Sequence, residues 1–209
     1  MSDCCDNKSC ALEALRARQR GTLKAVLWIN AVMFVAILAA GVLARSTAVL
    51  SDSLDNLGDA LTYGLTLYAV SRSDRAKAQV ALFKGALILA AGLFVVWQVA
   101  LKAAHPAVPA YETMTLASIA GLVANGICLA LLTRHRADDV NMSSVWECSR
   151  NDIASNLSVL VAAAGVWMTG AAWPDLLVGA ALALLFLKSA LRVLRNAWDA
   201  LAVRPVHDA

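Results

Sequence analysis

Six long apolar stretches follow one another along the chain, and they limit its possible folds more than any other feature. They lie at about residues 23–44, 47–70, 78–103, 114–133, 143–169 and 174–194. About 20 apolar residues in a helix cross the hydrocarbon core of a bilayer, and these stretches lack the alternating pattern of a transmembrane β-barrel. The sequence therefore predicts an all-α integral membrane protein with six transmembrane helices.

Composition supports this class and excludes two others. Of the 209 residues, 60% are hydrophobic and 16% charged, whereas a soluble domain is about half apolar and a quarter charged. Five cysteines are too few for a secreted disulfide scaffold. Because the first apolar stretch is long and others follow it, we expect a retained helix rather than a cleaved signal peptide. We expect a cytoplasmic tail over residues 1–21, a six-helix domain over 22–203 and a short cytoplasmic tail over 204–209, with no C-terminal domain.

The distribution of basic residues predicts the orientation of these helices. Basic residues gather before the first helix, in the second and fourth connections and at the C-terminus, whereas the other connections hold only Arg45 and Lys102. The positive-inside rule then places both termini in the cytoplasm of a cell whose inner (cytoplasmic) membrane holds the protein. The gathered residues are Lys8, Arg16, Arg18, Arg20, Lys24, Arg72, Arg75, Lys77, Arg134, Arg136 and Arg204.

The N-terminal tail contains three cysteines, Cys4, Cys5 and Cys10. One interpretation is an incidental disordered tail with reduced thiols. The other is an arm that collects soft metal ions, because thiolates select zinc, cadmium and copper(I). The spacing matches no closed zinc motif, so both interpretations stay open.

The second predicted helix carries three aspartates, Asp52, Asp55 and Asp59. An ionisable residue inside a membrane costs about 2.5–3.5 kcal/mol on insertion scales, so each one indicates function. Asp55 and Asp59 are four residues apart and share one helix face, and Asp52 lies near the same stripe. Carboxylates stacked in this way repel one another unless a cation lies between them.

The fifth predicted helix repeats this spacing with Cys148, Asp152 and Asn156. Arg150 lies on roughly the opposite face, although an ion pair between Asp152 and Arg150 is the alternative interpretation. Two helices that each offer ligands at i and i+4 can close a tetrahedral site with three oxygens and one sulfur, which suits zinc or cadmium. Metal and protons would compete for these groups, which is the physical basis of antiport. The candidate metal ligands are Asp55, Asp59, Cys148 and Asp152.

Other intramembrane residues support weaker expectations. Asp175 at the start of the sixth helix is expected to face the outer water as a helix N-terminal charge. Lys84 is expected to extend to the inner surface or to pair with Glu147 or Asp52. Cys128 is expected to be a small buried residue, and small residues such as Gly85 allow the third helix to approach a neighbour closely.

At this point the sequence resembles the cation diffusion facilitator family. The resemblance covers about residues 20–200 and implies a tetrahedral metal site between the second and fifth helices. In the family register that fits best, Asp55 and Asp59 are the second-helix ligands, and Asp52 occupies a common acidic position that is not a ligand. A second register would use Asp52 and Asn56 instead. The fifth helix has Cys148 where the family has histidine.

The resemblance also implies a function. It predicts a homodimer that exports zinc or cadmium in exchange for protons, with no resident cofactor, no covalent chemistry and no nucleic-acid partner. Relatives commonly continue into a cytoplasmic metal-binding domain after the sixth helix, and this sequence does not. The alternatives are a metal-binding partner or sensor subunit that does not transport, and an exporter of iron, cobalt or nickel.

Overall fold

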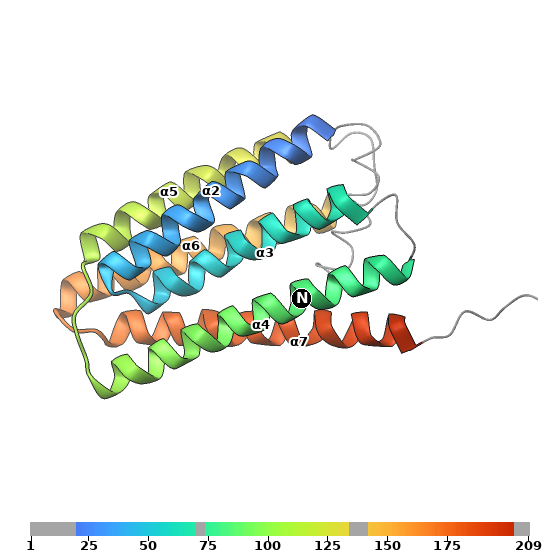
Figure 1. Ribbon diagram of the computed structural model, residues 1–209. Coiled ribbons are helices and arrows are strands. Elements are labelled where there is room, and N and C mark those ends of the chain that lie inside the picture. Colours follow the sequence, from blue (N-terminus) through green and yellow to red (C-terminus); the bar gives the residue numbers. More distant parts are fainter. Residues whose placement is uncertain (1–19, 70–73, 134–141, 203–209) are drawn as a thin grey trace, which may run out of the picture.

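The structure is a computed structural model that describes residues 20–69, 74–133 and 142–202, and all six predicted helices are present in it (Figure 1). Each begins and ends within a few residues of its apolar stretch, except that the last continues beyond the expected end. The helices are α2 (Arg20–Ala44), α3 (Thr47–Ala69), α4 (Asp74–Ala104), α5 (Tyr111–Thr133), α6 (Met142–Thr169) and α7 (Trp173–Ala202).

Five of these helices are long and apolar enough to cross a membrane, and α3 is the exception within the described residues. Its three aspartates all fall in the first 13 residues of the helix, which lowers its hydropathy. The other helices expose large apolar side chains at the surface, among them Trp28, Leu116 and Val161. An apolar exterior is what lipid requires, so the fold is that of an all-α, multi-pass membrane protein.

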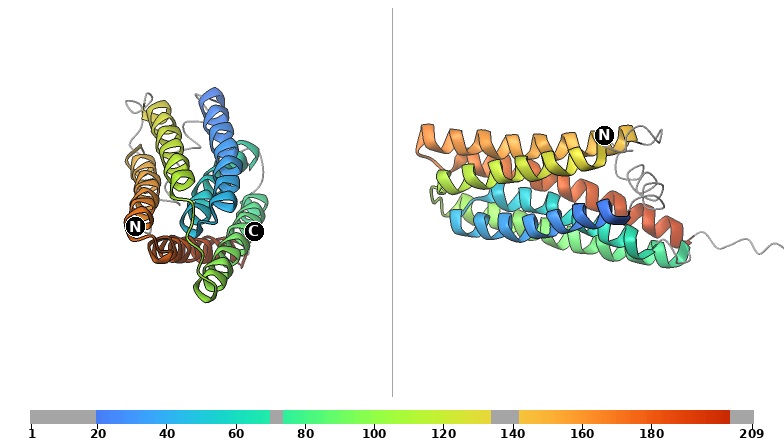
Figure 2. Two further views of the ribbon diagram at one scale, coloured as in Figure 1. Left: turned by 90° about the vertical axis from the view of Figure 1, so that its left-hand side faces the viewer. Right: turned by 90° about the horizontal axis from the view of Figure 1, so that it is seen from above.

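The helices pack mainly as three neighbouring pairs, namely α2 with α3, α5 with α6 and α4 with α7. The pair α4 and α7 lies along one side of the molecule (Figures 1 and 2). Two glycines of α4 allow this close approach: a Cβ atom added at Gly85 would lie 2.8 Å from Leu194 Cγ, and one at Gly92 would lie 2.9 Å from Leu187 Cδ2. The expectation that small residues allow the third predicted helix to approach a neighbour is thus confirmed, and the neighbour is α7 of the same chain.

Helix α3 contributes to two hydrophobic cores among the described residues. One core joins it to α2, α5 and α6 through residues such as Val49, Met114 and Val159. The other joins it to α4 and α7 through Leu54, Val95 and Ala183. A helix that is enclosed by neighbours does not need the hydropathy of a lipid-facing span, and this explains how α3 tolerates its carboxylates.

The first turn of α3 is capped by a side chain from another helix. Asp175 of α7 is only 1% exposed, and its carboxylate accepts hydrogen bonds from Thr47 N at 2.8 Å and Ala48 N at 3.0 Å. The hydroxyls of Ser46 and Thr47 donate to it at 2.5 and 2.8 Å. The expectation that Asp175 faces the outer water is therefore wrong, because it satisfies the free N–H groups of α3 instead.

The backbones of α3 and α7 also touch just beyond this cap. A Cβ atom at Gly179 would lie 2.6 Å from Thr47 Oγ1 and 2.7 Å from its carbonyl carbon. One turn later, Ser51 Oγ donates to the carbonyl oxygen of Gly179 at 2.8 Å. The first two turns of α3, which lead directly to Asp52, are thus held against α7.

Candidate intramembrane cation site

The structure brings the carboxylate of Asp52 on α3 near that of Asp152 on α6. Asp52 is 1% exposed, and the charge of Asp152 acts on its carboxyl group. Two carboxylates in a buried setting cannot both stay ionised unless a cation or a proton compensates them. This pair therefore has the electrostatics of a site that binds cations or protons.

Several buried polar atoms in the same part of the bundle lack a hydrogen-bond partner among the residues that the structure describes. In native proteins most such atoms are paired, and unpaired ones indicate a bound ion or water, or a functional role. On α3 they belong to Asp52 and Asn56, which are four residues apart on one face. On α6 they belong to Ser155 and Asn156, which follow one another in the sequence. The atoms are Asp52 Oδ1, Asn56 Oδ1 and Nδ2, Ser155 Oγ and Asn156 Oδ1.

Asn156 is oriented by two neighbours. Its Nδ2 donates to the carbonyl oxygen of Asp152 at 2.9 Å. Its Oδ1 lies against α5 at Gly121, where an added Cβ atom would be only 1.9 Å away. Helix α5 therefore forms a wall of the site, and only glycine leaves room for this amide.

The predicted ligands have different positions. Asp55, Asp59 and Asp152 are half-buried, whereas Cys148 lies within α6 but its side chain, like that of Arg150, is outside the described residues. Among the described side chains, no three of the types His, Cys, Asp and Glu gather as a metal cluster. The site of Asp55, Asp59, Cys148 and Asp152 stays a prediction.

The burial of Asp52 and Asn56 favours the second register of α3, in which these two residues are the ligands.

The side of α3 that carries Asp59 is in contact with a cation from α4. Lys84 donates a hydrogen bond to Thr62 Oγ1, which lies three residues after Asp59 and so on the same side of the helix. Thr62 Oγ1 in turn donates to the carbonyl oxygen of Gly58 at 2.6 Å. Lys84 thus reaches α3 through Thr62, a contact that the sequence does not predict.

A second polar contact joins α2 and α5. Cys128 is buried, as predicted, and its sulfur accepts a hydrogen bond from Asn30 Nδ2 at 3.7 Å. The same amide donates to the carbonyl oxygen of Val26 at 2.9 Å. Sequence reasoning missed Asn30, Asn125 and Ser155, although a polar residue within an apolar stretch was the available signal.

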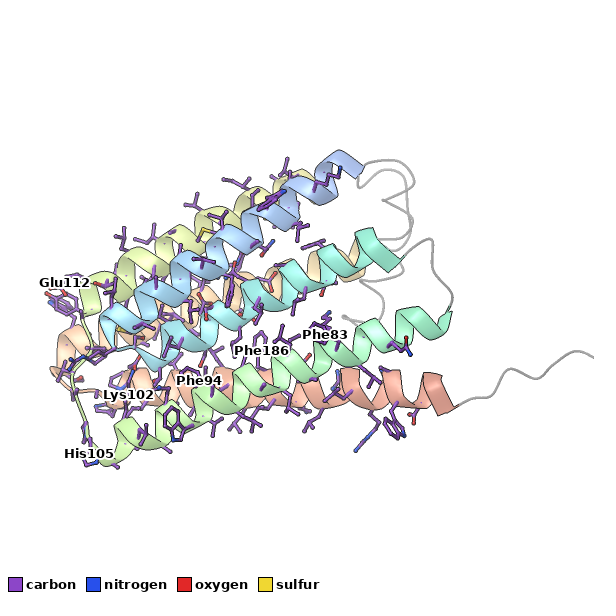
Figure 3. All side chains as sticks on the ribbon, viewed as in Figure 1. Phe83, Phe94, Lys102, His105, Glu112 and Phe186 are labelled. Atoms are coloured by element: carbon purple, nitrogen blue, oxygen red, sulfur yellow. The ribbon has the colours of Figure 1, made fainter. Side chains whose placement is uncertain are left out.

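His105 lies away from this centre. It is exposed in the connection between α4 and α5, at the same end of the bundle as Lys102 and Glu112 (Figure 3). The N-terminal cysteines Cys4, Cys5 and Cys10 lie outside the described residues.

Comparison with known proteins agrees with this architecture. The family model of the cation efflux transmembrane domain matches residues 23–202. The chain is similar to the metal cation efflux system protein CzcD of Cupriavidus metallidurans and to the cation efflux system protein CzcD of Alcaligenes sp., at 22% identity over 192 residues in each case. These alignments cover 83% of this chain and 61% of each relative, so the chain spans about three fifths of their length. The chain belongs to the cation efflux family, the cation diffusion facilitators.

Proposed function

We propose that this protein exports zinc or cadmium from the cytoplasm across the inner membrane, as a homodimer, in exchange for protons. The observation that carries the proposal is the buried carboxylate of Asp52, which lies beside Asp152 and among unpartnered polar atoms. Membership of the cation efflux family supports metal cation efflux in general. The names of the two relatives, which speak of cation efflux, support the same direction of transport.

The proposed ligands are Asp52 and Asn56 from α3, with Cys148 and Asp152 from α6. Each pair has the i, i+4 spacing that stacks two side chains on one helix face. Burial of Asp52 and Asn56 supports this register over Asp55 and Asp59, which are more exposed. The thiol of Cys148 supports a soft divalent ion, because thiolates favour zinc and cadmium over magnesium or calcium.

Proton exchange follows from the charges of these ligands. Two carboxylates and a thiolate exceed the charge of one divalent ion, so the empty site takes up protons and the arriving metal releases them. In transport by alternating access, the site would open first to the cytoplasm and then to the outside, where protons replace the metal. This cycle moves a cation and includes no covalent chemistry, so the protein is not proposed to be an enzyme.

The test is metal-driven proton flux in proteoliposomes that contain only this chain, with zinc and cadmium compared side by side. We expect flux in the unmodified protein and none in Asp52→Asn or Asp152→Asn, because each variant removes a charged ligand. Asp55→Asn should keep most of the flux. Glu112→Gln, an exposed acid at the start of α5, is the control and should match the unmodified protein.

Two other results would contradict the proposed ligands or the proposed transport. Loss of flux in Asp55→Asn or Asp59→Asn, with flux retained in Asp52→Asn, would restore the first register. Tight metal binding without any flux would instead indicate a partner or sensor subunit and would overturn the transport proposal.

A further inference from the structure

Asn125 of α5 is a buried polar residue that the proposed ligand set does not use. It is 6% exposed, and its Nδ2 has no hydrogen-bond partner within the described part of the chain. Leaving a buried amide unpaired destabilises the folded state. Such a group indicates an interaction that is completed by a ligand or a water molecule.

The packing of α5 against α6 places Asn125 at the level of the carboxylate pair. The two helices are joined by one connection and run antiparallel (Figure 1). Gly121 faces Asn156 directly, so a step of four residues forward along α5 corresponds to a step of four residues back along α6. This step leads from Gly121 to Asn125 and from Asn156 to Asp152, and Asn125 therefore lies at the height of Asp152.

The core of the bundle supports the same register. Farther along these two helices, Met114 and Ala117 of α5 pack in one cluster with Val159, Ala162 and Ala163 of α6. Asn125 also follows Gly121 by four residues, so both residues share the face that meets α6. Three helices, α3, α5 and α6, thus supply buried polar groups to one region.

The unpartnered atoms of this region include both donors and acceptors. Asn125 Nδ2, Asn56 Nδ2 and the Ser155 hydroxyl can donate, whereas Asp52 Oδ1, Asn56 Oδ1 and Asn156 Oδ1 can accept. A bare cation satisfies acceptors only. Water satisfies both kinds, and a buried water molecule typically makes about three hydrogen bonds.

We propose that Asn125 is a specificity-determining residue that binds a water molecule carried by the cation at Asp52 and Asp152. This inference rests on the proposed function and adds a third helix to its site. Of the two proposed cargo ions, Asn125 accordingly favours the larger cadmium, which readily accepts a water molecule beside four protein ligands. Zinc in closed sites is instead complete with four ligands.

The test uses cobalt(II) chloride and zinc chloride as probes for the purified full chain in detergent. Cobalt absorbs visible light strongly in four-coordinate sites and weakly in six-coordinate ones, so its spectrum reports retained water. We expect a weak spectrum for the unmodified protein. Asn125→Leu should strengthen the absorption and weaken cobalt binding about 10- to 100-fold, as is typical for the loss of an outer-shell partner. Zinc binding should change less.

Ser118→Ala is the matched control. Ser118 is also buried on α5, two turns before Asn125, but its hydroxyl already donates to the carbonyl oxygen of Met114 at 2.9 Å. The control should keep the spectrum and affinity of the unmodified protein. A strong four-coordinate spectrum in the unmodified protein, or an unchanged spectrum and affinity in Asn125→Leu, would overturn the inference.

Two further results are distinguishable from these. If Asn125→Leu does not fold, Asn125→Ser keeps a shorter hydrogen-bonding group and should weaken cobalt binding by a smaller factor; equal binding would count against the inference. If the unmodified protein binds neither cobalt nor zinc, the proposed function itself is overturned, and the inference with it.

Discussion

Gly121 shows how a residue without a side chain determines the position of a polar group. The Oδ1 atom of Asn156 occupies the space that a Cβ atom at Gly121 would fill, with a separation of 1.9 Å. No rotamer shift of a long side chain can relieve this contact cheaply, because the Asn156 amide is also held by its bond to the Asp152 carbonyl oxygen. The glycine therefore acts on the site without touching a cation.

Replacement of Gly121 by alanine should displace the Asn156 amide and disturb the region around Asp152. We expect zinc binding to weaken about tenfold and stability to fall by about 1–3 kcal/mol, the usual cost of overpacking. Gly126→Ala is the control, since its Cβ atom would meet nothing within 4 Å. Zinc titration and thermal unfolding compare the two variants. Equal zinc affinity and equal unfolding temperature would show that the Asn156 amide can move aside without cost.

At the scale of the elements, α3 combines burial with polarity because one neighbouring helix, α7, stabilises its first turns. Asp175 of α7 caps its first turn, and Gly179 allows the two backbones to touch. An aspartate near a helix N-terminus is also favoured by the helix dipole. Since Asp52 follows Thr47 by only five residues, the cap fixes the position of a carboxylate in the site.

Asp175→Asn should therefore lower both stability and transport. The amide keeps one acceptor oxygen but loses the negative charge to which several groups donate hydrogen bonds. The free energy of unfolding should therefore fall by about 1.5–3 kcal/mol. Thermal unfolding in detergent and initial rates of zinc uptake into vesicles measure the two effects. Asp199→Asn, an exposed aspartate at the other end of α7, should change neither quantity. An unfolding temperature of Asp175→Asn equal to that of the unmodified protein would contradict the capping role.

Across the whole molecule, the sequence predicts elements well and their contacts poorly. Apolar length alone located all six helices, because a bilayer imposes the same length on every span. The spacing of Cys148, Asp152 and Asn156 indicated a site on α6. However, three features depend on how the helices pack side by side. They are the cap of α3 by Asp175, the height of Asn125 along α5 relative to Asp152, and the burial of Asp52. Local periodicity gives the face of a helix but not its height against a neighbour. The sequence therefore favoured the register of Asp55 and Asp59, whereas burial favours that of Asp52 and Asn56.

The assembled bundle also predicts a stability that depends on metal. If Asp52 and Asp152 repel each other in the metal-free protein, a bound cation removes this repulsion and stabilises only the folded state. Zinc at about 100 times its dissociation constant should add about 2.7 kcal/mol of stability, which is visible as a higher unfolding temperature in detergent. A chelator should reverse the increase. Asp152→Asn should show little increase, because its amide neither repels Asp52 nor attracts the ion; a full increase in this variant would place the cation elsewhere in the bundle.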